Sequence, residues 1–340
     1  MKILLDVNHP AHVHILAQVA KKLSSRGDEF LFTAREKDVT VHLLREKQLP
    51  YVVLSKNGKS TLELFHELIH RTYAIFQTGR KFRPDAIVSC ASPCAAWAAK
   101  LLSIPHIAVT DTEHASLTIF LMRYASDAIV TPTWFTRNLG RPHIRYAGFH
   151  EYAYLNPQAF APDEKIAASY GLFAERPYSV VRFVEWNAAH DIGKHGLSAE
   201  EKGQIIDALL AKGPVVLSCE GDLPSGYGEK CITVSPNDIH HAMAFAAVFL
   251  GESCTMASEA ALLGTPAVCT SEYTAGVLSE QERSGMYFSE QDAQKALQLA
   301  ISFMDDPANK EKFGLRRDAM LEGHANVADV ILDMVDKLCH

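Results

Sequence analysis

The sequence predicts an α/β protein built from two parallel-sheet halves. Short apolar runs alternate with longer segments whose apolar residues recur at helical spacing. This order implies parallel sheets with helices on both faces. The alternation loosens once, over residues 148–177, where Pro157 and Pro162 stand close together, and then resumes. With 340 residues, the chain is long enough for two domains of about 100–200 residues each.

The first half begins with a continuous apolar strand and continues as a regular alternation. Its expected strands are Ile3–Val7, Glu29–Thr33, Tyr51–Leu54, Ala86–Val88, His106–Val109 and Ala128–Thr131. Helical spacing predicts helices over Val13–Leu23, Lys37–Lys47, Leu62–Gly79, Pro93–Leu102 and Leu117–Tyr124. We therefore expect an N-terminal Rossmann-like domain over residues 1–155.

The second half repeats the pattern after the loose segment. Its expected strands are Tyr178–Val184, Val215–Ser218, Cys231–Val234, Ala247–Leu250 and Ala267–Cys269. Expected helices are Ser198–Ala211, Asp238–Phe245 and Thr255–Leu263, and the tail from Gln291 to Leu338 is mostly helical. We expect a C-terminal domain over residues 170–340 and leave open that its terminal helices pack back on the N-terminal domain.

Composition narrows the classes of function. Apolar residues make up 48% of the chain and charged residues 21%, as in a globular protein with large cores. The net charge of −7 argues against nucleic acid as the main partner. There is no signal-peptide pattern, no apolar run of the about 18 residues that span a bilayer, and no paired spacing among the seven cysteines. We expect a cytoplasmic protein of undetermined oligomeric state, with peripheral membrane contact left open.

The segment over residues 247–266 carries the most informative pattern. A buried strand is followed by a turn of small and polar residues, then by a short helix that a Gly-Thr-Pro string ends. Free N–H groups and hydroxyls at such a helix N-terminus favour phosphate. Glu259 lies about two turns along the helix, at ~1.5 Å per residue, close enough to serve a sugar beside the phosphate. The alternative is an ordinary strand–helix unit of an α/β sheet.

Three histidines follow the first strand, in the string Asn8-His9-Pro10-Ala11-His12-Val13-His14. Open α/β sheets bind ligands outside the carboxyl ends of their strands, so this loop is well placed for function. Its imidazoles could donate to phosphate, transfer protons or bind a metal. We expect no metal, because no acidic ligand lies nearby in the sequence. The alternative is that His14 packs inside the helix and that only one or two histidines face outward.

A second strand-end loop, residues 110–116, combines two carboxylates with an imidazole. Asp111, Glu113 and His114 lie close together in the sequence, which favours shifted pKa values and proton transfer. The alternative is that Asp111 or Ser116 caps the next helix while Glu113 is solvated.

The first strand of the second half contains a basic residue. Arg182 interrupts an apolar run, and a buried guanidinium requires an anion, either a structural carboxylate or a ligand phosphate. The loop that follows is rich in groups suited to recognition, namely Trp186, Asn187, His190 and Asp191, with Lys194 just beyond.

One apparent motif is rejected. The string His66-Glu67-Leu68-Ile69-His70 matches the HExxH zinc pattern. In a chain with 16 histidines such a match arises easily by chance, and Tyr73 and Phe76 occupy positions where a longer metal pattern has Gly and His. We interpret it as one face of an amphipathic helix. Glycine-rich dinucleotide, P-loop and nucleophile-elbow motifs are absent from the sequence.

Several of these strings together resemble the family known as domain of unknown function 354, found in bacteria and archaea. The matching strings are Asn8-His9-Pro10-Ala11-His12-Val13-His14, Arg182-Phe183 with Trp186-Asn187-Ala188-Ala189-His190-Asp191, and Thr255-Met256-Ala257-Ser258-Glu259-Ala260 with Leu263-Gly264-Thr265-Pro266. More distantly, the chain is similar to the GT-B superfamily of sugar-nucleotide glycosyltransferases and to the UDP-N-acetylglucosamine 2-epimerases. The resemblance implies a GT-B-like fold, in which two Rossmann-like domains face each other across a cleft.

The resemblance also implies roles for individual residues. Ser253, Thr255 and Ser258 would hold a diphosphate that Arg182 faces, and Glu259 would bind ribose hydroxyls. The nucleotide-sugar set is completed by Gly251, Glu252, Trp186, Asn187, His190 and Asp191, and the catalytic set is His9, His12, Asp111, Glu113 and His114. The chain departs from the pattern in two places. The first-strand loop lacks the glycines of many GT-B enzymes, and Glu252-Ser253-Cys254-Thr255 replaces the double-glycine string of the epimerases.

The activity implied is that of a glycosyltransferase in cell-surface or polysaccharide biosynthesis. It would use a nucleotide-diphosphate sugar, with a UDP-sugar favoured, an unknown acceptor, and neither cofactor nor metal. The helix N-terminus and Arg182 would stabilise the departing diphosphate, and Glu113, Asp111 or His12 would activate the acceptor hydroxyl. One alternative is a sugar-nucleotide epimerase, which eliminates the diphosphate without an acceptor. Another is a non-catalytic nucleotide-sugar-binding protein.

Overall fold

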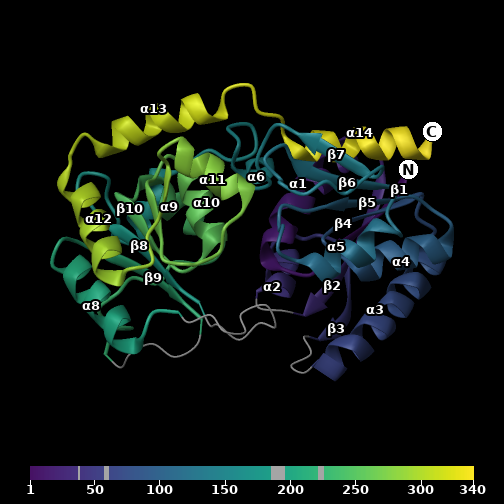
Figure 1. The fold of residues 1–340 in the computed structure, drawn as a ribbon, viewed down its shortest axis with the longest axis horizontal. Coiled ribbons are helices and arrows are strands. Elements are labelled where there is room, and N and C mark those ends of the chain that lie inside the picture. The colour runs from purple at the N-terminus through teal and green to yellow at the C-terminus, as the bar shows by residue number, and fades with distance from the viewer. Residues whose placement is uncertain (37–38, 57–60, 185–195, 221–225) are drawn as a thin grey trace. The chain divides into compact units, whose positions relative to one another are not determined.

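The chain forms two compact units, each described here by itself. The computed structural model describes residues 1–36, 39–56, 61–184, 196–220 and 226–340, without the side chains of residue 56 and residues 61–66. The N-terminal unit comprises Met1–Ala159 together with Gly323–His340, and the C-terminal unit comprises Phe160–Glu322 (Figure 1). The last helix therefore belongs to the N-terminal unit and not to the unit that precedes it in the sequence.

The N-terminal unit is built on a seven-stranded parallel sheet. Its strand order is β3-β2-β1-β4-β5-β6-β7, so the first strand lies in the interior of the sheet. The strands are β1 (Lys2–Val7), β2 (Glu29–Glu36), β3 (Tyr51–Lys56), β4 (Ala86–Cys90), β5 (His106–Val109), β6 (Ala128–Pro132) and β7 (His143–Tyr146). Strands β4, β5 and β6 are buried along their whole length, which explains their continuous apolar sequences.

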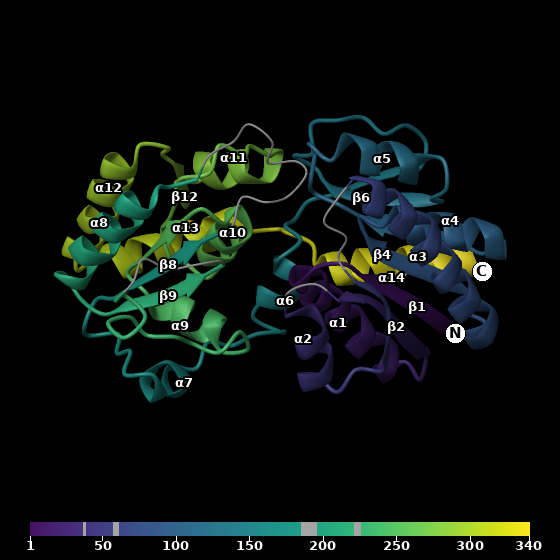
Figure 2. The same ribbon diagram turned by 90° about the horizontal axis from the view of Figure 1, so that it is seen from below.

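Helices cover both faces of this sheet, as Figure 2 shows. One face carries α1 and α14, and the other carries α3, α4 and α5. The helices of the unit are α1 (Pro10–Ser25), α2 (Thr40–Glu46), α3 (Thr61–Phe82), α4 (Pro93–Leu102), α5 (Ser116–Arg123), α6 (Tyr152–Leu155) and α14 (Val327–Cys339). Helix α14 packs against α1, where Lys22 and Asp329 form an ion pair of 2.7 Å.

The C-terminal unit is built on a five-stranded parallel sheet of order β12-β11-β10-β8-β9. Its strands are β8 (Ser179–Phe183), β9 (Val215–Cys219), β10 (Val248–Gly251), β11 (Ala267–Cys269) and β12 (Tyr287–Ser289). Its helices are α7 (Glu164–Ser169), α8 (Ala199–Leu210), α9 (Ile239–Phe245), α10 (Cys254–Leu262), α11 (Gly276–Arg283), α12 (Ala293–Asp305) and α13 (Asn309–Leu321). Helices α8 and α12 pack together over one face of the sheet, around Phe183, Ile206 and Leu209.

Helix starts follow from local sequence. Ser198 and Glu201 form a capping box at the start of α8, in which each side chain accepts a backbone N–H from the other residue. At α4, the Ser92 side chain accepts the N–H of Ala95, and Pro93 occupies the first helical position, where its missing N–H costs nothing. No helix among the described residues is long and apolar enough to cross a membrane.

The structure differs from the sequence prediction in several segments. Residues 231–234 form no strand: Ile232 makes a single bridge to Val216 at the edge of the sheet before the chain turns away. Strands β7 and β12 were not expected, because each is only three or four residues long and is defined by its neighbour in the sheet rather than by its own sequence. The loose segment contains α6, which packs on α1, and α7, which packs on α9.

A buried histidine gives the N-terminal unit a testable pH dependence. His106 is fully buried on β5, between the hydroxyls of Ser89 and Ser126 at 2.9 Å each, and burial lowers its pKa to about 3. In the unfolded chain this imidazole takes up a proton as the pH falls through about 6.5, whereas in the folded protein it stays neutral. The folded state therefore loses stability as the pH falls from 7 towards 4.

We expect His106→Gln to reduce this acid-dependent loss. Between pH 7 and pH 5, urea unfolding of the wild type should show a loss in unfolding free energy larger than that of the variant by about 2 kcal/mol. Equal losses in the two proteins would show that His106 is not held neutral. His42→Gln, which changes a histidine outside the sheet core, is the control and should behave like the wild type.

Candidate functional site

The strand order of each sheet locates its ligand-binding edge. In the N-terminal unit, β1 lies between β2 and β4, so the connections that leave β1 and β4 diverge. In the C-terminal unit, β8 lies between β9 and β10, with the same effect. Open α/β sheets bind ligands in the crevice that such a divergence opens at the carboxyl ends of the strands. The candidate residues are therefore those that follow β1, β4, β8 and β10.

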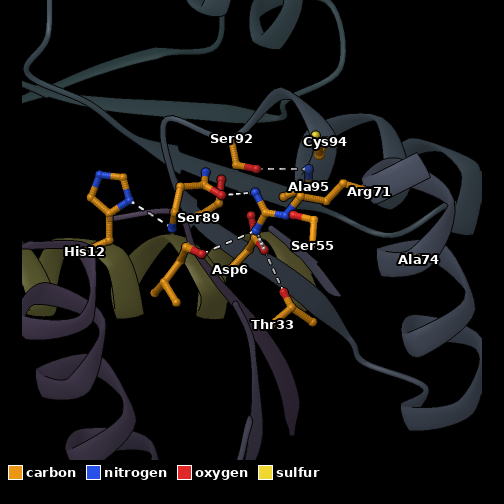
Figure 3. A network of polar contacts seen from close by, with 12 residues as sticks. Asp6, His12, Thr33, Ser55, Arg71, Ala74, Ser89, Ser92, Cys94 and Ala95 are labelled. Carbon is orange, nitrogen blue, oxygen red and sulfur yellow. Dashed lines mark hydrogen bonds and ion pairs between the residues drawn. The ribbon is translucent and has the colours of Figure 1, made fainter. Parts of the chain in front are cut away.

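A buried ion pair underlies the carboxyl end of β1. Arg71 reaches from α3 to Asp6, with its Nη2 atom 2.6 Å from Oδ1, and both residues are almost fully buried (Figure 3). Thr33 on β2 donates its hydroxyl to the same carboxylate oxygen at 2.7 Å. The guanidinium also donates to the side chain of Asn8 and, at 3.3 Å, to the carbonyl of Val7. Arg71 thus orients the first residue of the candidate loop from below.

Two of the expected catalytic histidines shape the turn into α1. His9 caps the helix, because its Nδ1 accepts the N–H of Ala11 at 3.3 Å. His12 Nδ1 lies 3.4 Å from the N–H of Asn8 (Figure 3), and the rings of His9 and His12 are 5.8 Å apart. The third histidine, His14, packs against Tyr154 with a ring separation of 5.1 Å. The structure therefore brings His9 and His12 together and places His14 in helix packing.

The neighbouring turn, between β4 and α4, contains a backbone feature of its own. Ala91 has a φ of 48°, in the left-handed region that residues with a Cβ rarely adopt. Such conformations persist only where the surroundings impose them, and they gather at functional sites. Ala91 directly precedes Ser92, the cap of α4, so the strained turn lies at the divergence of β1 and β4.

The loop after β5 places Asp111 beside a histidine that the sequence analysis missed. Asp111 Oδ2 lies 3.6 Å from Nδ1 of His150, whose ring also lies 3.3 Å from the Tyr146 hydroxyl. His150 is buried, and its Nε2 has no hydrogen-bond partner among the residues that the structure describes. Burial lowers the pKa of His150, and the Asp111 carboxylate opposes that change. A neutral imidazole oriented by a carboxylate is suited to accept a proton.

His150 was missed because its surroundings in the sequence look like a linker. It follows β7, a four-residue strand that periodicity did not reveal, and precedes the short helix α6. The usable signal was its position just beyond the carboxyl end of a strand in the same sheet as β5.

The other two expected catalytic residues of the β5 loop lie differently. The Glu113 carboxylate accepts the backbone N–H of Thr136 at 3.1 Å and the Thr136 hydroxyl at 2.5 Å, so it anchors the loop that follows β6. Helix α5 begins without a side-chain cap, so neither Asp111 nor Ser116 caps it. In the same turn, the Arg137 side chain donates to the carbonyl of Glu113, and His114 is the next residue.

In the C-terminal unit, the turn after β10 is held close to β8. A Cβ at Gly251 would lie 2.2 Å from the carbonyl oxygen of Arg182, so only glycine fits there. The next residue, Glu252, is buried and donates its own N–H to the Arg182 carbonyl. Its carboxylate accepts the N–H groups of Val184 and Leu197 at 3.1 and 2.7 Å. Glu252 therefore ties together the ends of β8, β10 and the segment before α8.

The first turn of α10 is the part of this segment that reaches the surface. Ser253, Cys254 and Thr255 are partly exposed, whereas the strand before them and the helix from Ala257 are buried. The Ser253 hydroxyl caps the helix by accepting the N–H of Met256 at 3.3 Å. The N–H groups of the residues between them have no acceptor within the helix, as in any first helical turn. This is an anion-binding geometry.

The two expected residues further along α10 face the interior. Glu259 is buried, with Oε1 3.1 Å from Nε2 of His240 on α9. Ser258 is buried against α11, where its hydroxyl accepts a hydrogen bond of 2.9 Å from Gln281.

Arg182 has both a partner and an exposed edge. Its guanidinium donates to the Ser218 hydroxyl at 2.6 Å and pairs with the Glu220 carboxylate. The side chain keeps 19% of its surface exposed. The sequence analysis left open a structural carboxylate or a ligand phosphate, and the structure supplies the carboxylate. Trp186, Asn187, His190 and Asp191, expected to bind the nucleotide sugar, lie outside the described residues.

The HExxH string on α3 has an ordinary structural role in its described part. The Glu67 carboxylate pairs with Arg35 at 2.5 Å and accepts the Ser55 hydroxyl at 3.0 Å, which ties α3 to β2 and β3. The described part of the chain contains no group of three or more His, Cys, Asp or Glu side chains arranged to hold a metal ion.

Comparisons with known proteins place the chain in a family. A family model described as "Protein of unknown function (DUF354)" matches residues 1–339. The chain belongs to this family. The matched range includes every string on which the sequence resemblance rested. No curated protein matches the sequence.

Solved structures share the fold at low sequence identity. A putative UDP-N-acetylglucosamine 2-epimerase from Listeria monocytogenes is 12% identical, with a TM-score of 0.71 over 97% of this chain and 94% of that one. The UDP-GlcNAc 2-epimerase from Neisseria meningitidis, solved with UDP-GlcNAc, is 12% identical, with a TM-score of 0.71 over 99% of this chain and 100% of that one. The spinosyn forosaminyltransferase SpnP is 14% identical, with a TM-score of 0.64 over 100% and 99%. The two parallel sheets thus form a GT-B-like fold, as the sequence predicted.

The buried pair beneath the β1 loop should be essential for stability. We expect Arg71→Ala to lower the unfolding free energy by about 3–5 kcal/mol, because it leaves the Asp6 carboxylate buried without its cation. Urea unfolding measures the change. Lys22→Ala, which removes a half-exposed ion pair with Asp329, is the control and should cost no more than about 1 kcal/mol. Equal effects of the two substitutions would show that Arg71 is not needed to neutralise Asp6.

Proposed function

We propose that this DUF354 chain is a GT-B-type glycosyltransferase that uses a nucleotide-diphosphate sugar, with a UDP-sugar favoured, and no metal ion. The proposal depends mainly on the first turn of α10, a half-exposed helix N-terminus at the point where β8 and β10 diverge. Ser253 and Thr255 add hydroxyls to the backbone N–H groups there. This combination suits a diphosphate.

Arg182 supplies the positive charge in this proposal. Arg182 is the next-to-last residue of β8, and Gly251 of β10 lies directly beside it in the sheet. Glu220 and Ser218 hold the guanidinium in one orientation, which lowers the cost of ordering it when a ligand binds. As the bond to the sugar breaks, Arg182 and the α10 N–H groups would stabilise the charge that develops on the departing diphosphate.

The N-terminal unit supplies the acid–base chemistry in this proposal. Asp111 and His150 form a carboxylate–imidazole pair at the carboxyl edge of the sheet, and the neutral His150 is the group that accepts the proton from the acceptor hydroxyl. Glu113 holds the neighbouring loop through Thr136, and His9 and His12 line the β1 turn. The sequence suggested Glu113, Asp111 or His12 as the group that activates the acceptor, and this proposal assigns that role to Asp111 together with His150.

A sugar-nucleotide 2-epimerase is the second candidate. Two structures of similar fold are UDP-GlcNAc 2-epimerases, with higher TM-scores than the transferase SpnP. Both activities need a diphosphate site, so the α10 turn supports either. The epimerase differs in needing no acceptor.

Binding of the nucleotide is tested first. We expect UDP to bind the purified protein in calorimetric titrations, and Arg182→Met to weaken that binding about ten-fold or more through the loss of a charged contact. Arg283→Met is the matched control, because Arg283 belongs to the same unit but is largely exposed and pairs with Glu280 on its own helix. If both variants bind UDP as the wild type does, Arg182 does not face the diphosphate.

The reaction type is tested by NMR. The protein is incubated with UDP-N-acetylglucosamine alone, and then with a panel of sugar and lipid hydroxyl acceptors. We expect the donor to persist without an acceptor, and UDP to be released when a suitable acceptor is added. The appearance of a 2-epimer without any acceptor would contradict the transferase and establish the epimerase.

A further inference from the structure

Two cysteines meet at the start of α10. Cys254 is the first residue of the helix, and Cys269 is the last residue of the neighbouring strand β11. Their sulfur atoms are 3.9 Å apart. All seven cysteines lie in the described residues and none is in a disulfide, and Cys254 and Cys269 are the pair whose sulfurs are in contact.

The surroundings of Cys254 favour its thiolate. The contact with the Cys269 sulfur lowers the pKa of Cys254, as do hydrogen bonds from the side chains of Ser271 and Tyr287. Burial acts in the opposite direction and is outweighed. The position at the first turn of a helix adds the positive end of the helix dipole, which stabilises thiolates.

The two cysteines differ in the way that a reactive pair requires. Cys254 is the more accessible residue of the two, since it is only partly buried, whereas Cys269 is completely buried. Cys269 has a raised pKa, because of its contact with the Cys254 sulfur and its burial. Of the two sulfurs, Cys254 is thus the one whose thiolate is favoured. The less buried Cys254 is therefore the candidate nucleophile, and Cys269 is the thiol placed to react with it.

We infer that Cys254 and Cys269 form a reversible disulfide in response to hydrogen peroxide. The Cys254 thiolate attacks one oxygen of the peroxide, so that an S–O bond forms, the O–O bond breaks and hydroxide leaves. The Cys269 sulfur then attacks the sulfenic sulfur, the S–S bond forms, and the S–O bond breaks. The departing hydroxide takes the Cys269 proton and leaves as water. The hydroxide released in the first step takes up the proton that Cys254 lost on ionising, so in total two thiols and one peroxide give one disulfide and two waters.

Little movement is needed to close this bond. A disulfide has sulfur atoms about 2.05 Å apart, so the two sulfurs must approach by about 2 Å. Cys254 belongs to the half-exposed first turn of α10, which can adjust, whereas Cys269 lies in the core of the sheet. The bond would link the first turn of α10 to β11, a strand already paired with β10.

The experiment maps the bond by mass spectrometry. The full-length reduced protein is treated with hydrogen peroxide, its free thiols are alkylated, and it is digested without reduction. Trypsin alone is unsuitable, because no Lys or Arg lies between Lys230 and Arg283. A glutamyl endopeptidase cuts after Glu252, Glu259 and Glu272 and so separates the two cysteines into peptides 253–259 and 260–272. We expect these peptides to be joined, and a dithiol to release them.

Three variants assign the roles. In Cys269→Ser, the cross-link should be lost and Cys254 should stop at a sulfenic acid that a dimedone probe labels. In Cys254→Ser, Cys269 should remain unoxidised. Cys231→Ser is the matched control, since Cys231 belongs to the same unit and is also partly exposed, and it should form the cross-link as the wild type does.

Failure would be unambiguous and independent of the proposed function. In the reduced wild type at pH 7, we expect Cys254 to be alkylated about ten-fold faster than Cys231. If the two are alkylated at the same rate and peroxide leaves peptides 253–259 and 260–272 unlinked, the pair is not a redox site. Circular dichroism of each variant shows that a lost cross-link does not reflect unfolding. None of these measurements uses a nucleotide.

Discussion

The whole arrangement depends on one constraint of parallel sheets, namely that all strands end at the same edge. In both units the first strand lies inside the sheet, so its connection leaves on one side and that of its neighbour on the other. The polar residues after β1, β5 and β10 can therefore be far apart in the sequence and still lie at the carboxyl edge of their sheet. His9, Asp111 and Ser253, which follow β1, β5 and β10, owe their positions to this order.

Buried charged side chains hold the carboxyl edge of each sheet in place, by different contacts in the two units. In the N-terminal unit, Arg71 comes from a helix and neutralises Asp6 beneath the β1 loop. In the C-terminal unit, the carboxylate of Glu252 gathers backbone N–H groups from two other segments. Arg71 was not a candidate from the sequence, because a single Arg on a helix is common in any sequence. Glu252 was expected to bind the nucleotide sugar, whereas in the structure its carboxylate accepts backbone N–H groups.

Sequence reasoning predicted the repeated α/β pattern and the turn at Ser253, because those signals are local: continuous apolar runs, capping residues and a Gly-Thr-Pro stop. It missed what depends on neighbours. His150 acquires its carboxylate from a loop nearly forty residues earlier, and Glu220 acquires Arg182 from the adjacent strand. The strand expected over residues 231–234 is an error of the opposite kind, because the structure forms only a single bridge there. Apolar alternation cannot reveal whether a segment pairs along its whole length with the edge of a sheet. The loop that contains Trp186 and His190 lies outside the described residues.

The placement of α14 has a consequence for how the protein is made. This helix packs on α1, yet it follows the entire C-terminal unit in the chain. During synthesis, the C-terminal unit can complete its core on the ribosome while α1 still exposes the surface that α14 covers. Domains generally fold as units in order of synthesis. The N-terminal unit is therefore synthesised first but can complete its packing only after the C-terminal unit has been made. Exchanging one unit between relatives would require two junctions in the chain instead of one.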